Sequence, residues 1–263
     1  TLYFVGDLIN TSGLQVTATY IDGSTRAIPA SALEISFDSS TAGDEIPVVV
    51  SYEGKETSFN VRVDEGLSFP YHDDFSDAAL FQNNWAQYGG GSSGWLLEDG
   101  MCKTASSSAP GQKLELIGGL TVSDFMLETD IAYLGGGGVD AGVIFRAADV
   151  TDRGDGYRGY YAYLANGAVG LGRCDNAWDS AFKKEVAANV KFGDVYRMKI
   201  ACRGNNIKIY LDGELMLDVN DSKFSSGSVG FRAHYALAAY DNFVVSNDPD
   251  YVDTTVYKNL LQK

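Results

Sequence analysis

The sequence is short of basic residues and of long apolar runs, and both shortages narrow the range of functions. Its 263 residues include 20 Lys and Arg against 35 Asp and Glu, so the formal net charge is −15 at pH 7. A chain this acidic is repelled by phosphate backbones and by anionic lipid. No run of about 18 apolar residues is present that could span a bilayer. We therefore expect neither nucleic acid as a partner nor insertion into a membrane.

Histidine and cysteine are also scarce. The two histidines, His72 and His234, argue against a histidine-based zinc site. The three cysteines, Cys102, Cys174 and Cys202, form an odd set without a CxxC pair. At least one thiol must be free, which argues against a disulfide scaffold. We expect buried thiols that pack as small apolar side chains.

Turns and short alternating segments are abundant instead. The chain contains 30 glycines and 16 tyrosines. Asp-Gly or Asn-Gly pairs, which close tight turns between strands, stand at residues 22–23, 99–100, 155–156, 166–167 and 212–213. Strands separated by such turns predict an all-β protein.

Four segments can be separated along the chain. Residues 1–65 alternate almost throughout and suit a small immunoglobulin-like sandwich. Residues 66–70 contain glycine and proline, as a linker does. Residues 71–246 hold roughly a dozen predicted strands, which fit a larger two-sheet jelly roll. Residues 247–263 are acidic and are predicted to be a tail or linker. Because the chain opens in a predicted strand, we expect a fragment of a longer protein.

The first segment resembles a known family. Its pattern YFVGDLINTSGLQVTATYIDGSTRAIP, followed by FDSSTAGDEIPVVVSYEGKETSFNVRV, is similar to the bacterial immunoglobulin-like repeats of cell-surface and secreted enzymes. The resemblance implies a spacer domain. No group of titratable side chains around an apolar hollow is evident in this segment, which also favours a spacer.

The centre of the second segment carries the strongest pattern. Three alternating runs, Val139–Ala147, Gly159–Leu164 and Val169–Cys174, predict neighbouring strands with one buried face. In the first run, Val139, Ala141, Val143 and Phe145 share the predicted core face, and Asp140, Gly142, Ile144 and Arg146 share the other. In the later run Gly227–Tyr235, Arg232 and His234 lie opposite the apolar stripe. The pattern predicts a shallow polar binding face.

Charged and aromatic residues on this face suit a sugar. Hydroxyl groups bind charged, planar partners more strongly than neutral ones, and aromatic rings cover the C–H surfaces of the sugar. Ala162 and Leu164 fall on the core side with Tyr160, so Tyr161 is predicted to point outward. The predicted carbohydrate-binding residues are Asp140, Arg146, Tyr161, Trp178, Arg232 and His234. The alternative is an ordinary charged surface with an Asp140–Arg146 ion pair.

The second segment also resembles a family, through its motifs AGVIFRA, GYYAYL, VGLGRCDNAW, YRMKI, IKIYLDGELMLDV, SGSVGFRA and AYDNFVV. It is similar to the concanavalin-A-like sandwiches of secreted glycoside hydrolases, in particular to the family 66 carbohydrate-binding modules of bacterial levanases. Tyr163 departs from this pattern, which has glycine there as GYYxGL. We expect its side chain to fill or reshape the pocket.

The resemblance implies a function. It implies a non-catalytic module of a secreted bacterial glycoside hydrolase, located outside the cell or on its surface. The module would bind a polysaccharide or oligosaccharide through a terminal sugar, with the fructosyl unit of levan or inulin favoured. It would be covalently linked to a catalytic domain in the parent chain.

Two other functions stay open. One is an adhesin or structural spacer without a sugar pocket. The other is a hydrolase acting on modified sugars, for which Glu128 and Asp130 are candidate acids. Their side chains share a strand face about 7 Å apart, a spacing that an inverting glycosidase tolerates.

A structural calcium ion is a further expectation. Asp73, Asp74, Asp241 and Asn242 lie in the first and last predicted strands of the larger sandwich, which such folds bring together. Hard oxygen ligands of this kind suit Ca²⁺, with Asp74 and Asp241 as the predicted ligands. The alternative is a network of Asp side chains satisfied by backbone amides.

Overall fold

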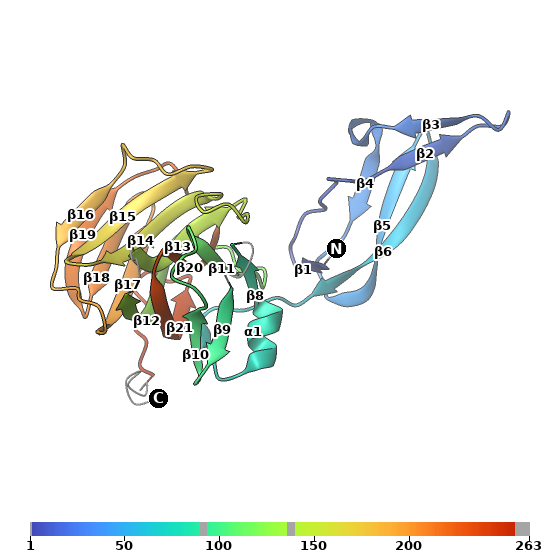
Figure 1. Ribbon diagram of the computed structural model, residues 1–263. Coiled ribbons are helices and arrows are strands. Elements are labelled where there is room, and N and C mark those ends of the chain that lie inside the picture. Colours follow the sequence, from blue (N-terminus) through green and yellow to red (C-terminus); the bar gives the residue numbers. More distant parts are fainter. Residues whose placement is uncertain (1, 90–93, 136–139, 256–263) are drawn as a thin grey trace. The chain divides into compact units, whose positions relative to one another are not determined.

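The computed structural model describes residues 2–89, 94–135 and 140–255, and the chain divides into two compact units, Thr1–Leu67 and Ser68–Lys263. Both units are built from antiparallel sheets, apart from one parallel strand pair in the first unit, and the predicted all-β class is confirmed (Figure 1). Within the described residues, no helix has the length and apolar character needed to cross a membrane.

The first unit is a small immunoglobulin-like sandwich. One sheet has the order β1 (Leu2–Phe4), β6 (Lys55–Asp64), β5 (Gly43–Tyr52) and β4 (Glu34–Phe37), and a separate hairpin joins β2 (Val16–Thr19) to β3 (Thr25–Ile28), followed by a 3₁₀ turn at Ala30–Ala32. Alternate side chains of β5 and β6, among them Val48, Val50, Val61 and Val63, form its core with Tyr3. The period of two that predicted these strands is therefore the period of burial.

The second unit is a two-layer sandwich (Figure 1). The eight-stranded sheet has the order β19 (Glu214–Asn220), β18 (Asn206–Leu211), β17 (Val195–Arg203), β12 (Phe125–Gly135), β21 (Leu237–Ser246), β10 (Met101–Thr104) and β9 (Trp95–Glu98), with β7 (Tyr71–Asp73) also paired to β21. The seven-stranded sheet has the order β16 (Lys184–Ala187), β15 (Ala168–Asp175), β14 (Arg158–Ala165), β13 (Asp140–Ala148), β20 (Ser228–His234), β11 (Gln112–Leu116) and β8 (Trp85–Tyr88). The predicted jelly-roll sandwich is confirmed.

Aromatic side chains join the two layers. Phe231 on β20 stacks on Tyr240 of β21 with ring centroids 4.2 Å apart, and Phe125 on β12 meets Phe145 on β13 at 5.8 Å. Phe145 is thus on the core face, as the alternation predicted. Val139, predicted on the same face, lies outside the described residues. The three cysteines are free and buried, as predicted.

The short helix α1 spans Ala78–Asn84. Asp77 explains the start, because its carboxylate accepts hydrogen bonds from the backbone amides of Ala79 and Leu80. This is the N-cap geometry that satisfies the first free amides of a helix.

The described part of the acidic tail is attached to the sandwich. Asp250 lies 2.6 Å from the guanidinium of Arg203, and Asp253 lies 3.8 Å from that of Arg197. The Asp253 side chain is only 3% exposed. Two acidic residues of the segment 247–255 thus form ion pairs with β17, and the tail or linker stays a prediction. Residues 256–263 lie outside the described residues.

Candidate functional site

The outer face of the seven-stranded sheet carries a second, smaller apolar layer. Alternation turns Ile144, Tyr161 and Tyr163 away from the inter-sheet core, where Phe145 and Tyr160 lie. Two loops cover part of this face, residues 149–157 between β13 and β14 and residues 176–183 between β15 and β16. The buried cluster consists of Ile144, Ala147, Tyr157, Tyr161, Tyr163 and Cys174, with Val150, Ala165 and Trp178 packed against it. Part of the outer face of this sheet is therefore buried under loop residues and is not directly exposed to solvent.

A pocket of about 360 Å³ opens beside this cluster. Its lining residues are Asp140, Asp155, Tyr163, Ala165, Trp178, Lys183, Glu185, Arg232 and His234. They come from strands β13, β14, β16 and β20 and from the two covering loops. The pocket thus combines a sheet floor with loop walls.

Arg232 is the central cation of the pocket. Its side chain is 2% exposed, and Nη2 donates to Asp155 Oδ1 at 2.6 Å. Its Nη1 lies 3.6 Å from Asp140 Oδ1, and its guanidinium carbon stands 4.6 Å from the centre of the Tyr161 ring. Two carboxylates and one aromatic face therefore stabilise a cation that burial alone would disfavour.

Asp140 connects the pocket to the apolar layer. Its Oδ1 accepts a hydrogen bond from the Tyr161 hydroxyl at 2.8 Å. Burial raises the pKa of Asp140 above its ordinary value, and the neighbouring Arg232 opposes that rise. In the β13–β20 register Asp140 stands opposite His234. The register thus places an acid, a guanidinium and an imidazole within one small area.

Two buried polar atoms of the residues that line the pocket have no partner among the described residues. They are Nε of Arg232 and Nδ1 of His234. Burial, followed by the adjacent Arg232, lowers the pKa of His234. A neutral imidazole offers one acceptor and one donor. Because buried polar atoms are almost always hydrogen-bonded, these two atoms are candidate partners for a polar ligand or an ordered water.

Aromatic rings form the opposite wall. Tyr163 lies directly over Gly170, where a Cβ atom would come within 2.1 Å of the ring. Trp178 lies over Gly172 in the same way, at 2.0 Å. The Tyr163 hydroxyl donates to Glu185 at 3.0 Å. Tyr163 therefore lies flat along the sheet as part of the pocket wall, and a pocket remains beside it.

Four of the six predicted binding residues line this pocket: Asp140, Trp178, Arg232 and His234. Tyr161 has the predicted outward direction, but it is fully buried beneath Arg232 and Tyr163. It supports the pocket floor and does not line the pocket.

Arg146 requires a correction. It has a φ of +47°, and the β13–β20 register shifts between Phe145 and Ala147, which marks a β-bulge. Its side chain is 1% exposed and donates to the backbone carbonyls of Ser123, Gly204 and Phe224. The bulge breaks the alternation from which its outward direction was predicted. Arg146 is thus structural, and the predicted Asp140–Arg146 pair is replaced by Asp140–Arg232.

Trp95, on β9, is a core residue and not part of the pocket. It is 4% exposed and packs against Phe231 and Tyr240. Sequence reasoning also missed three charged residues of the pocket, Asp155, Lys183 and Glu185. Asp155 belongs to an Asp-Gly pair, and aspartate is common in such turns without any role in ligand binding. No local pattern distinguishes it from the other turn acids.

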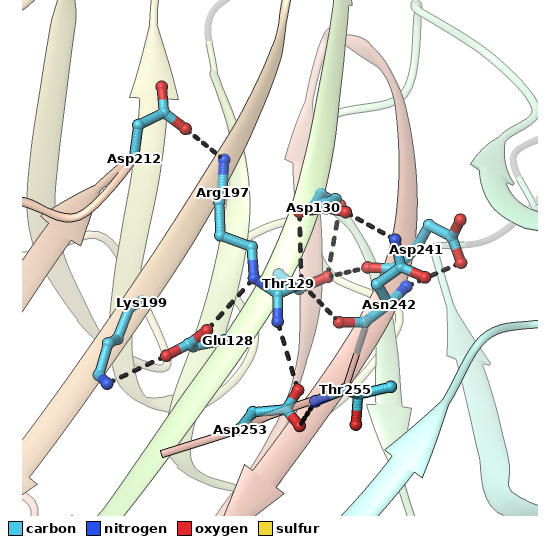
Figure 2. Close-up of polar contacts among 10 residues, drawn as sticks. All are labelled: Glu128, Thr129, Asp130, Arg197, Lys199, Asp212, Asp241, Asn242, Asp253 and Thr255. Atoms are coloured by element: carbon cyan, nitrogen blue, oxygen red, sulfur yellow. Dashed lines mark hydrogen bonds and ion pairs between the residues drawn. The ribbon is translucent and has the colours of Figure 1, made fainter. Parts of the chain in front are cut away.

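A larger hollow of about 590 Å³ lies on the eight-stranded sheet, next to Glu128 and Lys199. Figure 2 shows that Glu128 and Asp130, the candidate catalytic acids, belong to a network there. Arg197 lies 3.3 Å from each carboxylate, Lys199 lies 3.0 Å from Glu128, and Asn242 donates to Asp130 at 2.6 Å. Glu128 is thus paired with two cations, and Asp130 with one cation and an amide. These contacts give no support to a catalytic pair.

The residues predicted for calcium are near one another but differently engaged. β7 pairs with β21, so the first and last strands do lie together. Asp74 accepts hydrogen bonds from the backbone amide and hydroxyl of Ser76, and Asp241 accepts one from the backbone amide of Asn242. In the part of the chain that is described, no three His, Cys, Asp or Glu residues gather as metal ligands do. These contacts fit the Asp–backbone network, and calcium binding stays a prediction.

Solved structures share the fold of this chain. The carbohydrate-binding module CBM66 of Bacillus subtilis has a TM-score of 0.53 at 24% identity, covering 62% of this chain and 95% of that one. A Bacillus subtilis protein with a galectin-like fold has a TM-score of 0.55 at 15% identity, covering 67% and 94%. A Bacillus licheniformis β-glucanase has 0.52 at 12%, covering 69% and 99%.

Two curated proteins share parts of the sequence. A Bacillus subtilis levanase is 32% identical over 125 residues, which is 46% of this chain and 17% of the levanase. An exo-β-1,6-galactobiohydrolase of Bifidobacterium longum is 45% identical over 69 residues, 24% of this chain and 4% of that protein. The chain thus spans only a small part of either relative.

Family models cover both units. Residues 1–63 match the bacterial Ig-like domain of group 3, in agreement with the predicted first domain. Residues 74–246, most of the second unit, match the 3-keto-alpha-glucoside-1,2-lyase-like domain. With that match over more than half of its length, the chain belongs to the 3-keto-alpha-glucoside-1,2-lyase-like family, preceded by a bacterial Ig-like domain.

Proposed function

We propose that the second unit is a carbohydrate-binding module that holds a terminal sugar in the Arg232–His234 pocket. The observation that carries the proposal is the pair of buried, unpartnered atoms, Arg232 Nε and His234 Nδ1, on residues that line one pocket with Tyr163 and Trp178. A sugar hydroxyl can accept from the first atom and donate to the second. The aromatic wall suits the C–H surface of the ring.

The charge of the pocket favours a neutral sugar. Arg232 is paired with Asp140 and Asp155, and Lys183 lies 2.6 Å from Glu185. The lining thus holds three carboxylates against two cations, which would repel a carboxylated or phosphorylated sugar. The levanase relative favours the fructosyl end of levan or inulin as the ligand.

The same contacts support a binding role without catalysis. Asp140 and Asp155 both lie against Arg232, and Asp140 also accepts from Tyr161. Neither carboxylate is positioned as the partner of a second free acid, as glycoside hydrolysis requires. The module would act by raising the local substrate concentration for a catalytic domain of the parent chain. This role belongs outside the cell or on its surface, where polysaccharides are met.

Isothermal titration tests the proposal directly. The full chain is titrated with fructose, levan, inulin and arabinan, and His234→Ala is compared with His72→Ala. The second variant removes the other histidine, which lies on β7 outside the pocket. We expect weak, saturable binding of a fructan that His234→Ala reduces about five- to thirtyfold, the effect of losing about one to two kcal/mol, and that His72→Ala preserves.

Other outcomes favour the alternatives. No binding of any sugar by a folded chain would favour an adhesin or structural spacer. The family name raises a third candidate, cleavage of a modified sugar such as a 3-keto glucoside. Incubation with that substrate tests it, because product release by this chain alone would replace the binding role by an enzymatic one.

A further inference from the structure

Lys113 is a buried cation next to the pocket but not in its lining. It lies on β11, paired with Arg232 of β20, and is 0% exposed. Its Nζ donates to the backbone carbonyls of Arg153 at 2.7 Å, Gly111 at 3.0 Å and Gly154 at 3.2 Å. An ammonium has three donors. All three are therefore committed, two of them to the 149–157 loop.

The same loop carries Asp155, which forms the pocket wall with Arg232. Its backbone approaches the chain before β11 unusually closely. A Cβ atom on Gly154 would come within 2.2 Å of the Pro110 carbonyl, and one on Gly111 within 2.6 Å of the Gly154 carbonyl. Asp152 accepts a hydrogen bond from the backbone amide of Gly89 at 3.1 Å. The loop is thus docked on its neighbours, and the charged ammonium of Lys113 binds two of its carbonyls.

We propose that Lys113 is a positioning residue for sugar binding: its ammonium holds the 149–157 loop in place, and the loop in turn holds Asp155 against Arg232. This inference rests on the proposed function, because it assigns to Lys113 the assembly of the same pocket. Asp155 and Arg232 touch the sugar, and Lys113 does not.

The number of donors makes this contact sensitive to pH. Burial, and next Arg232, lower the pKa of Lys113 to about 8, whereas Asp155, Cys174 and Asp152 oppose the shift. Once deprotonated, the amine has only two N–H donors for three carbonyls. The loop is therefore held below pH 8 and loosened above it. The titratable groups that face Lys113 are Arg232 on β20, Asp152 and Asp155 on the loop, and the thiol of Cys174 on β15, whose pKa burial raises to about 11.

The size of the effect follows from the charged fraction. With a pKa of about 8, the charged form falls from roughly nine-tenths at pH 7 to roughly one-tenth at pH 9. If only the held loop binds sugar, the apparent affinity falls about tenfold over this range, because it scales with the competent fraction. Lys113→Met keeps most of the buried stem and removes the charge.

The experiment has two readouts on the full chain. The first is fructan affinity by titration calorimetry between pH 6.5 and 9.5. The second is tryptic cleavage after Arg153, measured by mass spectrometry relative to cleavage after Arg203. Both bonds are Arg-Gly bonds in exposed connections, so the pH dependence of trypsin itself cancels in the ratio. Lys103→Met, which removes a lysine on β10 paired with Glu98 and Asp99, is the matched control.

We expect the wild-type affinity to fall about tenfold from pH 7 to pH 9, while the cleavage ratio rises. In Lys113→Met, the fructan affinity and the cleavage ratio should not vary with pH, and both should equal the values that the wild type reaches at high pH. Lys103→Met should show the same pH dependence as the wild type. A wild-type cleavage ratio independent of pH would overturn the proposal, even if the variant does not fold. So would a pH-dependent affinity in Lys113→Met. If no sugar binds, the proposed function fails and the cleavage ratio still tests the loop contact.

Discussion

At the scale of single residues, Arg232 organises the candidate site. It contacts Asp140, Asp155 and the Tyr161 ring at once, from an almost fully buried position. Removing one partner of such a buried set leaves the others uncompensated, which typically costs about 3–5 kcal/mol. Substitutions of Arg232 would therefore confuse binding with stability. His234, at the edge of the pocket, is the cleaner probe.

His234 predicts a pH dependence of stability. Its pKa is lowered in the folded chain, first by burial and then by Arg232, from an ordinary value of 6.5. As the pH falls through about 6.5, the unfolded chain therefore binds a proton that the folded chain resists, and the free energy of unfolding decreases. His234→Gln should lose less stability between pH 7.5 and 5.5 than the wild type does.

Urea unfolding at the two pH values measures this difference. His72→Gln serves as the control, because His72 lies on β7 away from Arg232. An unchanged pH dependence in His234→Gln would show that the imidazole is not held neutral by its surroundings.

At the scale of elements, two glycines of β15 create room for the aromatic wall. Gly170 and Gly172 face outward, and Tyr163 and Trp178 occupy the space that side chains there would fill. Tyr163, which departs from the GYYxGL pattern, is accommodated in this way. The glycines thus determine where the rings lie and, through them, the width of the pocket.

Gly172→Ala should weaken sugar binding more than it weakens the fold. Its Cβ would meet the Trp178 ring at 2.0 Å, and the ring, rather than the backbone, would move. Loss of one aromatic contact of about 1 kcal/mol corresponds to a roughly five- to tenfold weaker affinity. Titration calorimetry and thermal unfolding measure the two effects.

Gly94→Ala is the control for this prediction. A Cβ at Gly94 would make an ordinary contact of 3.6 Å with Gln87. Equal affinities of Gly172→Ala and the wild type would mean that Trp178 does not touch the sugar.

At the scale of the whole molecule, the two units have separate cores. The first is built around Val48, Val50, Val61 and Val63, and the second around the aromatic contacts between its sheets. A spacer role for the first unit agrees with this division. The tail extends the second unit, since Asp250 and Asp253 pair with Arg203 and Arg197.

Scanning calorimetry of the full chain should therefore show two transitions, of which sugar shifts only one. At a ligand concentration of about 100 times Kd, the bound unit gains about 2.7 kcal/mol, which raises the Tm of a domain of this size by roughly 5–10 °C. The Ig-like unit should unfold at the same temperature with and without sugar. A shift of both transitions would indicate that the units unfold together or that both bind the ligand.

The sequence alone determined the strands and most of their faces. A period of two is a local property of the extended chain, so it identified the sheets around Val139–Ala147 and placed Asp140, Arg232 and His234 on one face before any fold was known. It failed at Arg146, where a single bulged residue with φ +47° reverses the alternation.

Only the tertiary structure decided which residues close the pocket. Asp155 reaches Arg232 across 77 residues, and Lys113 reaches Arg153 across 40. Tyr161 has the predicted direction, yet Arg232 from a distant strand and Tyr163 bury it. The physical reason is that the direction of a side chain follows from its own strand, whereas loop docking depends on contacts between distant segments that no local pattern records.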